Sequence, residues 1–123
     1  MLDKAVSAIA FLGVPGLALL LAVSATGYAG AAALTTALAA LGPGGMVGGI
    51  ATLGAMGLIS LWVSQFGFDS IFKGVVAELE KRGETAESII DTIDGYPISK
   101  KLKCTLKEKF YKSNLIEKGN NND

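Results

Sequence analysis

No charged residue lies between Lys4 and Asp69, and this 64-residue stretch constrains the fold more than any other feature of the sequence. A helix or strand of a protein in water keeps polar and charged side chains on the face that solvent touches. A stretch of this length without Asp, Glu, Lys, Arg or His has no such face. We therefore expect residues 5–68 to be embedded in a membrane.

The composition divides the chain at about residue 68. Of the 22 charged residues, all but Asp3 and Lys4 fall in 69–123, where acidic and basic residues balance. A nucleic-acid-binding domain usually carries an excess of Lys and Arg, so we expect no nucleic acid partner.

Side chains suited to catalysis or metal binding are scarce. The chain has one cysteine, Cys104, and no histidine. This composition excludes a disulfide within the chain, and it lacks the usual zinc ligands and the usual general base. We predict that the protein is not an enzyme and that it binds no metal or cofactor.

Glycine and proline divide the uncharged stretch into three apolar segments, at about 5–23, 24–41 and 46–66. As helices, the first and third would reach about 28 and 31 Å, close to the thickness of a bilayer core. Pro15 predicts a kink in the first helix. The second segment is short and rich in alanine, so it is either a span or a re-entrant arm. The predicted fold is all-α, with two or three transmembrane helices.

The first segment also has features of a secretory signal. Lys4 precedes an apolar run, and small residues at 23–25 resemble a cleavage site. Because the apolar character continues well beyond residue 25, we expect the segment to be retained.

Residues 69–117 have the pattern of a small helical tail. Asp69 or Ser70, Thr85 and Ser99 are suitable caps for three amphipathic helices. The apolar positions that recur at helical spacing are Ile71, Phe72, Val75, Val76 and Leu79, then Ile89, Ile90 and Ile93, then Leu102, Leu106 and Phe110. Residues 118–123 have little apolar content, and we expect them to be disordered.

Small residues spaced four apart favour close helix packing in lipid, where apolar contact alone gives no gain. They are dense around the third segment, and we predict that they form a helix-packing or oligomer interface. The predicted interface residues are Gly44, Gly45, Gly48, Gly49 and Gly57. A homo-oligomer is therefore expected.

Two groups of residues suggest contact with the membrane surface. Trp62 and Phe66 lie at the end of the third segment, where aromatic residues often meet the headgroups. A lysine cluster that includes Lys100, Lys101, Lys103 and Lys107 surrounds the last apolar stripe. It suits a helix lying on anionic lipid, and equally a solvated face of a small bundle.

Positive charge follows the third segment closely at Lys73, Lys81 and Arg82. The bias of Lys and Arg toward the cytoplasmic side of a membrane predicts that the tail is cytoplasmic. We expect an integral protein of a bacterial inner membrane or an organelle membrane.

The stretch from Gly27 to Leu58, with its GPGGMVGGIATLGAMGL run, resembles the small glycine-rich interferon-inducible membrane proteins of the 6-16 type. The resemblance covers about residues 24–62 and does not extend to the tail. It implies a Gly/Ala-rich membrane hairpin in an organelle or inner membrane, with a role in cell death or antiviral defence.

The pattern as a whole predicts an oligomer that alters membrane permeability, as a pore or a holin-like effector. The alternative is a non-conducting membrane anchor whose tail, residues 69–117, recruits a partner protein.

Overall fold

The computed structural model describes residues 1–41 and 51–121, and all of the regular structure within them is α-helical. The prediction of an all-α fold is thus confirmed for this part of the chain. The helices are α1 (Leu2–Phe11), α2 (Val14–Thr26), α3 (Tyr28–Ala40), α4 (Ala51–Phe66), α5 (Phe68–Lys81), α6 (Ala86–Asp94) and α7 (Lys100–Asn121).

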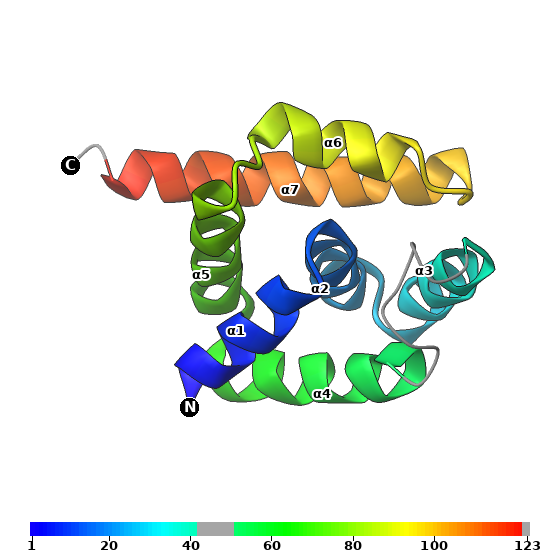
Figure 1. Ribbon diagram of the computed structural model, residues 1–123, viewed down its shortest axis with the longest axis horizontal. Helices are drawn as coiled ribbons and strands as arrows, with labels where there is room; N and C mark the ends of the chain where they lie inside the picture. The colour runs from blue at the N-terminus through cyan, green and yellow to red at the C-terminus, as the bar shows by residue number, and fades with distance from the viewer. Residues whose placement is uncertain (42–50, 122–123) are drawn as a thin grey trace.

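Helix α2 lies in the middle of the molecule (Figure 1). Every residue from Leu17 to Ala22 is fully buried, and α2 packs against each of the other six helices. A helix that is apolar on all sides must be covered on all sides. The most hydrophobic segment of the chain therefore forms the centre of the core.

The predicted tail helices cover part of α2. Their three apolar stripes are all buried, and their side chains belong to the same hydrophobic cluster as those of α2. Two of the three predicted caps are present. The Thr85 hydroxyl accepts a bond from the Ser88 amide, and the Ser99 hydroxyl accepts one from the Leu102 amide. The cap predicted at Asp69 or Ser70 is wrong, because α5 begins at Phe68 after Gly67 and has no side-chain cap bond.

The first apolar segment differs from the expected single kinked helix over 5–23. It forms α1 and α2, which are bent by 119° relative to each other. Gly13 adopts a positive φ of 76° between them, and Pro15 falls in the first turn of α2. A backbone N–H in the first turn makes no hydrogen bond within the helix, so proline, which lacks this group, fits there. Pro15 therefore starts a helix instead of kinking one.

Glycines with positive φ make two further breaks. Gly27 separates α2 from α3, whereas one helix over 24–41 was expected. Gly67 separates α4 from α5, and these helices are bent by 115°. The predicted third segment thus ends at Phe66 as expected, while residues 46–50 lie outside the described part of the chain. Disorder was expected over 118–123. Helix α7 continues to Asn121, and residues 122–123 lie outside the described part of the chain.

Among the described residues, no single helix is both long and apolar enough to cross a bilayer. The two bent pairs, Leu2–Phe11 with Val14–Thr26 and Gly54–Phe66 with Phe68–Lys81, meet the length and composition requirement only when each pair is taken together.

The corner between α1 and α2 depends on close backbone contact at Gly16. A Cβ atom there would overlap with the carbonyl oxygen of Ile9 and lie 2.9 Å from Cβ of Leu12. On α4, by contrast, a Cβ atom at Gly54 would have no neighbour within 4 Å.

We expect Gly16→Ala to lower the free energy of unfolding by about 1 to 3 kcal/mol, because the backbone must move to admit the methyl group. Gly54→Ala is the matched control. It should raise stability by about 0.5 to 1 kcal/mol, as alanine favours a helix interior over glycine. Urea unfolding followed by circular dichroism measures both. Equal or greater stability of Gly16→Ala would show that the corner is not tightly packed.

Candidate functional site

The exposed side of α4 carries no charged side chain. We call this surface the charge-free face, and its residues are Gly54, Gly57, Leu58, Ser60, Leu61, Ser64 and Gln65. On the neighbouring α1, by contrast, Asp3 and Lys4 are exposed.

Two large apolar side chains are exposed on the charge-free face. Leu58 is 49% exposed and Leu61 is 51% exposed. Single exposed apolar residues are common on protein surfaces. These two differ because the other exposed residues of α4 around them carry no charge. The face is therefore suited to contact with something apolar.

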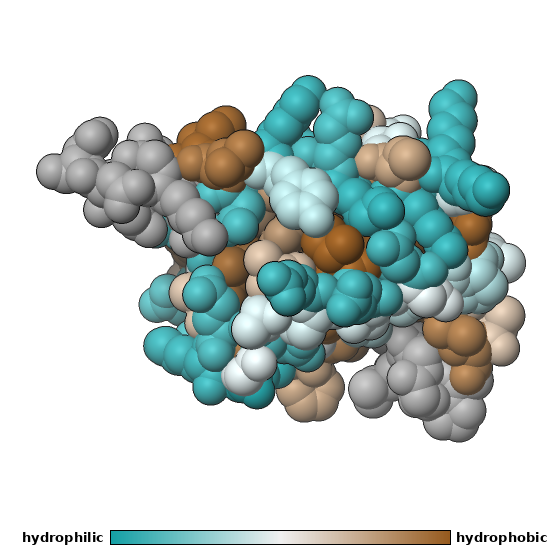
Figure 2. Space-filling model, turned by 90° about the horizontal axis from the view of Figure 1, so that it is seen from above, coloured by the Kyte–Doolittle hydropathy of each residue, from teal (hydrophilic) through white to brown (hydrophobic). Residues whose placement is uncertain are grey.

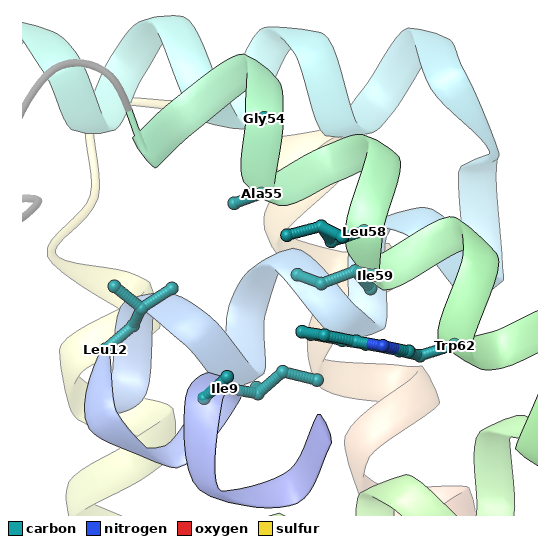
Figure 3. Close-up of a pocket in the computed structure, with 8 residues that line it drawn as sticks. Ile9, Leu12, Gly54, Ala55, Leu58, Ile59 and Trp62 are labelled. Atoms are coloured by element: carbon teal, nitrogen blue, oxygen red, sulfur yellow. The ribbon is translucent and has the colours of Figure 1, made fainter. Parts of the chain in front are cut away.

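A groove opens between α1 and α4 beside this face, with a volume of about 330 Å³. Leu58, Ile59 and Trp62 reach from α4 toward Ile9 and Leu12 of α1 (Figure 3). The lining is completed by three small residues, Ala8, Gly54 and Ala55. The indole nitrogen of Trp62 is the one polar side-chain atom among the lining residues.

Charged side chains gather on the opposite side of the molecule. Figure 1 places α6 and α7 on one side of α2 and α4 on the other. Viewed from the α6–α7 side, the surface is mostly hydrophilic (Figure 2). The α6–α7 side is thus charged and the exposed side of α4 is not, while Asp3 and Lys4 on α1 and Asp69 and Lys73 on α5 are exposed as well.

Two of the four lysines predicted for the membrane interface bind within the protein instead. Lys103 Nζ donates to the backbone oxygen of Asp94 at 2.6 Å, and Lys107 Nζ lies 2.8 Å from Asp94 Oδ1. Asp94 is the last residue of α6, where cations offset the helix dipole. The hydrogen bond to Asp94 raises the pKa of Lys107. The other two, Lys100 and Lys101, are exposed at the start of α7.

The two groups predicted to meet the membrane lie far apart in the fold. Trp62 and Phe66 are on α4, where both pack partly against the core, and the four lysines are on α7. Because α4 and α7 lie on opposite sides of α2 (Figure 1), one flat bilayer does not reach both groups in this conformation.

The predicted small-residue interface falls largely outside the described residues, which omit Gly44, Gly45, Gly48 and Gly49. Gly57 is exposed on the charge-free face, and a Cβ atom there would have no neighbour within 4 Å. It makes no close helix contact within the described chain. Its role between copies of the chain stays a prediction.

The glycine that brings two helices together was not predicted. A Cβ atom at Gly74 on α5 would lie 2.6 Å from Cγ2 of Val6 on α1. Gly74 lies among charged tail residues, and its sequence neighbours give no indication of the contact. A periodic pattern identifies a buried side of a helix without identifying what covers it.

Arg82 connects the charged tail to α1. Its Nη1 donates to the backbone oxygen of Ala10 at 2.5 Å, in a partly buried bond. The same oxygen accepts from the Gly13 amide at 2.9 Å. Ala10 lies in the last turn of α1, where a cation is favoured. This bond and the Gly74 contact hold α1 against α5.

A second apolar patch lies at the C-terminal end of α7. Tyr111, Leu115 and Ile116 are 49%, 69% and 59% exposed. Figure 2 shows an apolar patch at this end of the molecule. It is separate from the charge-free face, because α7 and α4 lie on opposite sides of the fold (Figure 1).

No group of three or more His, Cys, Asp or Glu side chains in the described part of the chain is placed to hold a metal ion. The Tyr96 hydroxyl is buried without a hydrogen-bond partner among the described residues. Burial, and secondly the charge of Glu84, raise the pKa of Tyr96, so its hydroxyl stays protonated.

No protein-family model, no curated protein and no solved structure matches this chain.

We expect Arg82→Met to lower the free energy of unfolding by about 1 to 2 kcal/mol, because it leaves the Ala10 carbonyl without its charged donor. Lys81→Met is the matched control next to it. Lys81 makes an exposed pair with Glu78 at 3.5 Å, and its loss should change stability by less than about 0.5 kcal/mol. Urea unfolding of both variants measures the difference. Equal effects would show that Arg82 does not hold α1.

Proposed function

We propose that this protein acts on lipid bilayers: it binds through the charge-free face, inserts its apolar helices and, as a homo-oligomer, alters membrane permeability. The observation that carries the proposal is the separation of surfaces. The exposed stripe of α4 contains no charge, while the charged helices α6 and α7 lie on the other side of the core (Figure 1).

The exposed side chains give a rough measure of the binding step. Fully burying a leucine or phenylalanine contributes about 1.5 to 3 kcal/mol. Leu58 and Leu61 are each about half exposed, so together they contribute roughly 2 kcal/mol. This corresponds to about a thirtyfold preference for the membrane surface over water. Such binding is reversible and does not depend on anionic lipid.

Insertion requires the fold to open. The side chains of α2 are covered by α5, α6 and α7, so α2 meets lipid only when these helices move away. The α1–α2 pair, now bent by 119°, has the length and composition of a span. A bilayer stabilises the opened form because hydrocarbon then replaces the tail as the cover of α2.

A change in permeability requires several copies. One chain has too few helices to enclose an aqueous path, so the copies must assemble in the membrane. Gly57 on the charge-free face and the predicted glycines at 44, 45, 48 and 49 offer close helix approach between copies. In this proposal the charged tail stays on the cytoplasmic side of a bacterial inner membrane or an organelle membrane. Permeabilisation would serve cell death or antiviral defence.

We expect the purified protein to bind neutral phosphatidylcholine vesicles and release a trapped dye, and Leu61→Asp to bind at least tenfold more weakly. The aspartate replaces apolar burial with a charge at the lipid surface. Leu61 is exposed, so the fold should be kept. Leu115→Asp places the same change on α7 and should bind and release dye as the wild type does. Equal loss in both variants, or none in either, would contradict binding through the charge-free face.

The alternative function is a membrane-bound adaptor that recruits a partner protein through its tail. The exposed patch of Tyr111, Leu115 and Ile116 favours it, because an apolar helix end is a suitable docking surface. Leu115→Asp separates the two proposals. If the protein is an adaptor, Leu115→Asp should abolish recruitment of the partner and leave vesicle binding intact. The wild-type protein should then release no dye. Deleting 69–123 is less informative, because the tail shares its core with α2.

A further inference from the structure

We propose that the groove between α1 and α4 binds one acyl chain of a membrane phospholipid. This inference deepens the proposed membrane function and rests on it for the source of the chain. The site consists of Ala8, Ile9 and Leu12 from α1 and Gly54, Ala55, Leu58, Ile59 and Trp62 from α4.

The chemistry of the lining selects a ligand without polar groups. None of the eight lining residues carries a charge, and only the Trp62 indole offers a hydrogen-bond donor. A peptide bound in extended form would leave its backbone N–H and C=O groups without partners here. A hydrocarbon chain has no such groups to satisfy.

The shape of the groove suits one acyl chain. It is open along one side and has a volume of about 330 Å³. An unbranched chain of methylene groups can lie in such a groove and contact the apolar side chains of both helices.

Small residues keep the space open. A Cβ atom at Gly54 would have no neighbour within 4 Å, and Ala8 and Ala55 are the next smallest side chains of the lining. Leu58 and Trp62 extend across the gap toward Ile9 (Figure 3). Larger residues at 8 or 54 would occupy the space now left between the two helices.

The position of the groove identifies the phospholipid chain as its occupant. Gly54 and Leu58 belong both to the lining and to the charge-free face. A chain in the adjoining leaflet therefore reaches the groove from the α4 side without crossing a charged surface. No cationic side chain lines the groove to hold the carboxylate of a free fatty acid. The phospholipid headgroup stays at the bilayer surface while one chain enters.

Trp62 is the sole tryptophan of the chain and lines the groove, so its fluorescence reports occupancy directly. The probe is a zwitterionic lysophospholipid with a dibrominated acyl chain, used below its micelle concentration with full-length protein. Bromine quenches a nearby indole. We expect saturable quenching at one lipid per chain that lowers the Trp62 emission at least twofold. The unbrominated lipid should compete without quenching.

Gly54→Leu and Ala8→Leu fill the groove from opposite walls, and each should weaken binding at least tenfold. Ser64→Leu is the matched control. It adds the same side chain to the exposed face of α4, outside the lining, and should bind within twofold of the wild type. Circular dichroism checks that each variant is folded. Two filling variants are used so that the test still holds if one of them does not fold.

Quenching that does not saturate, or that persists in both filling variants, would overturn the acyl-chain site. Tighter binding of a brominated free fatty acid, by tenfold or more, would overturn the assignment to phospholipid. The proposed function fails separately. If the wild-type protein releases dye from vesicles but shows no saturable quenching, only the acyl-chain site is wrong. If it binds the lysolipid but leaves vesicles intact, only the permeability function is wrong.

Discussion

Burial of α2 is the constraint on which the rest of the structure depends. No face of this helix suits water, so each side needs an apolar cover. The N-terminal half supplies α1, α3 and α4, and the charged tail supplies the apolar stripes of α5, α6 and α7. The tail is therefore part of the core and not an appendage. Because the tail covers one side of α2, the charged residues gather there, and α4 on the other side presents a surface without charge.

Periodicity and capping residues predicted the tail well. Its buried stripes and the caps at Thr85 and Ser99 depend only on local spacing and local hydrogen bonds. The break at Gly67 falls where the third segment was expected to end, but the corner at Gly13 was not predicted. A glycine in an apolar run permits a positive φ without requiring it, so the sequence did not distinguish a kinked span from two helices bent by 119°.

The candidate site was predicted only in part. Trp62 was singled out as an aromatic residue at a membrane interface, and it lines the groove beside the charge-free face. The groove itself was missed, because it pairs Ala8 with Gly54 across helices that are distant in sequence. Lys103 and Lys107 were counted with the membrane surface, whereas their partner is Asp94 at the end of α6. Residue type identified Trp62 and the lysines as residues that make contacts, but only the tertiary fold determined what each one contacts.

The chain carries one natural reporter on each side of the fold: Trp62 on α4 and Cys104, exposed, on α7. The most direct test adds neutral vesicles and measures acrylamide quenching of Trp62 together with labelling of Cys104 by a membrane-impermeant maleimide. If the charge-free face enters the bilayer, quenching of Trp62 should fall several-fold while Cys104 reacts as fast as in solution. Unchanged quenching of Trp62, or protection of Cys104 in its place, would contradict the account.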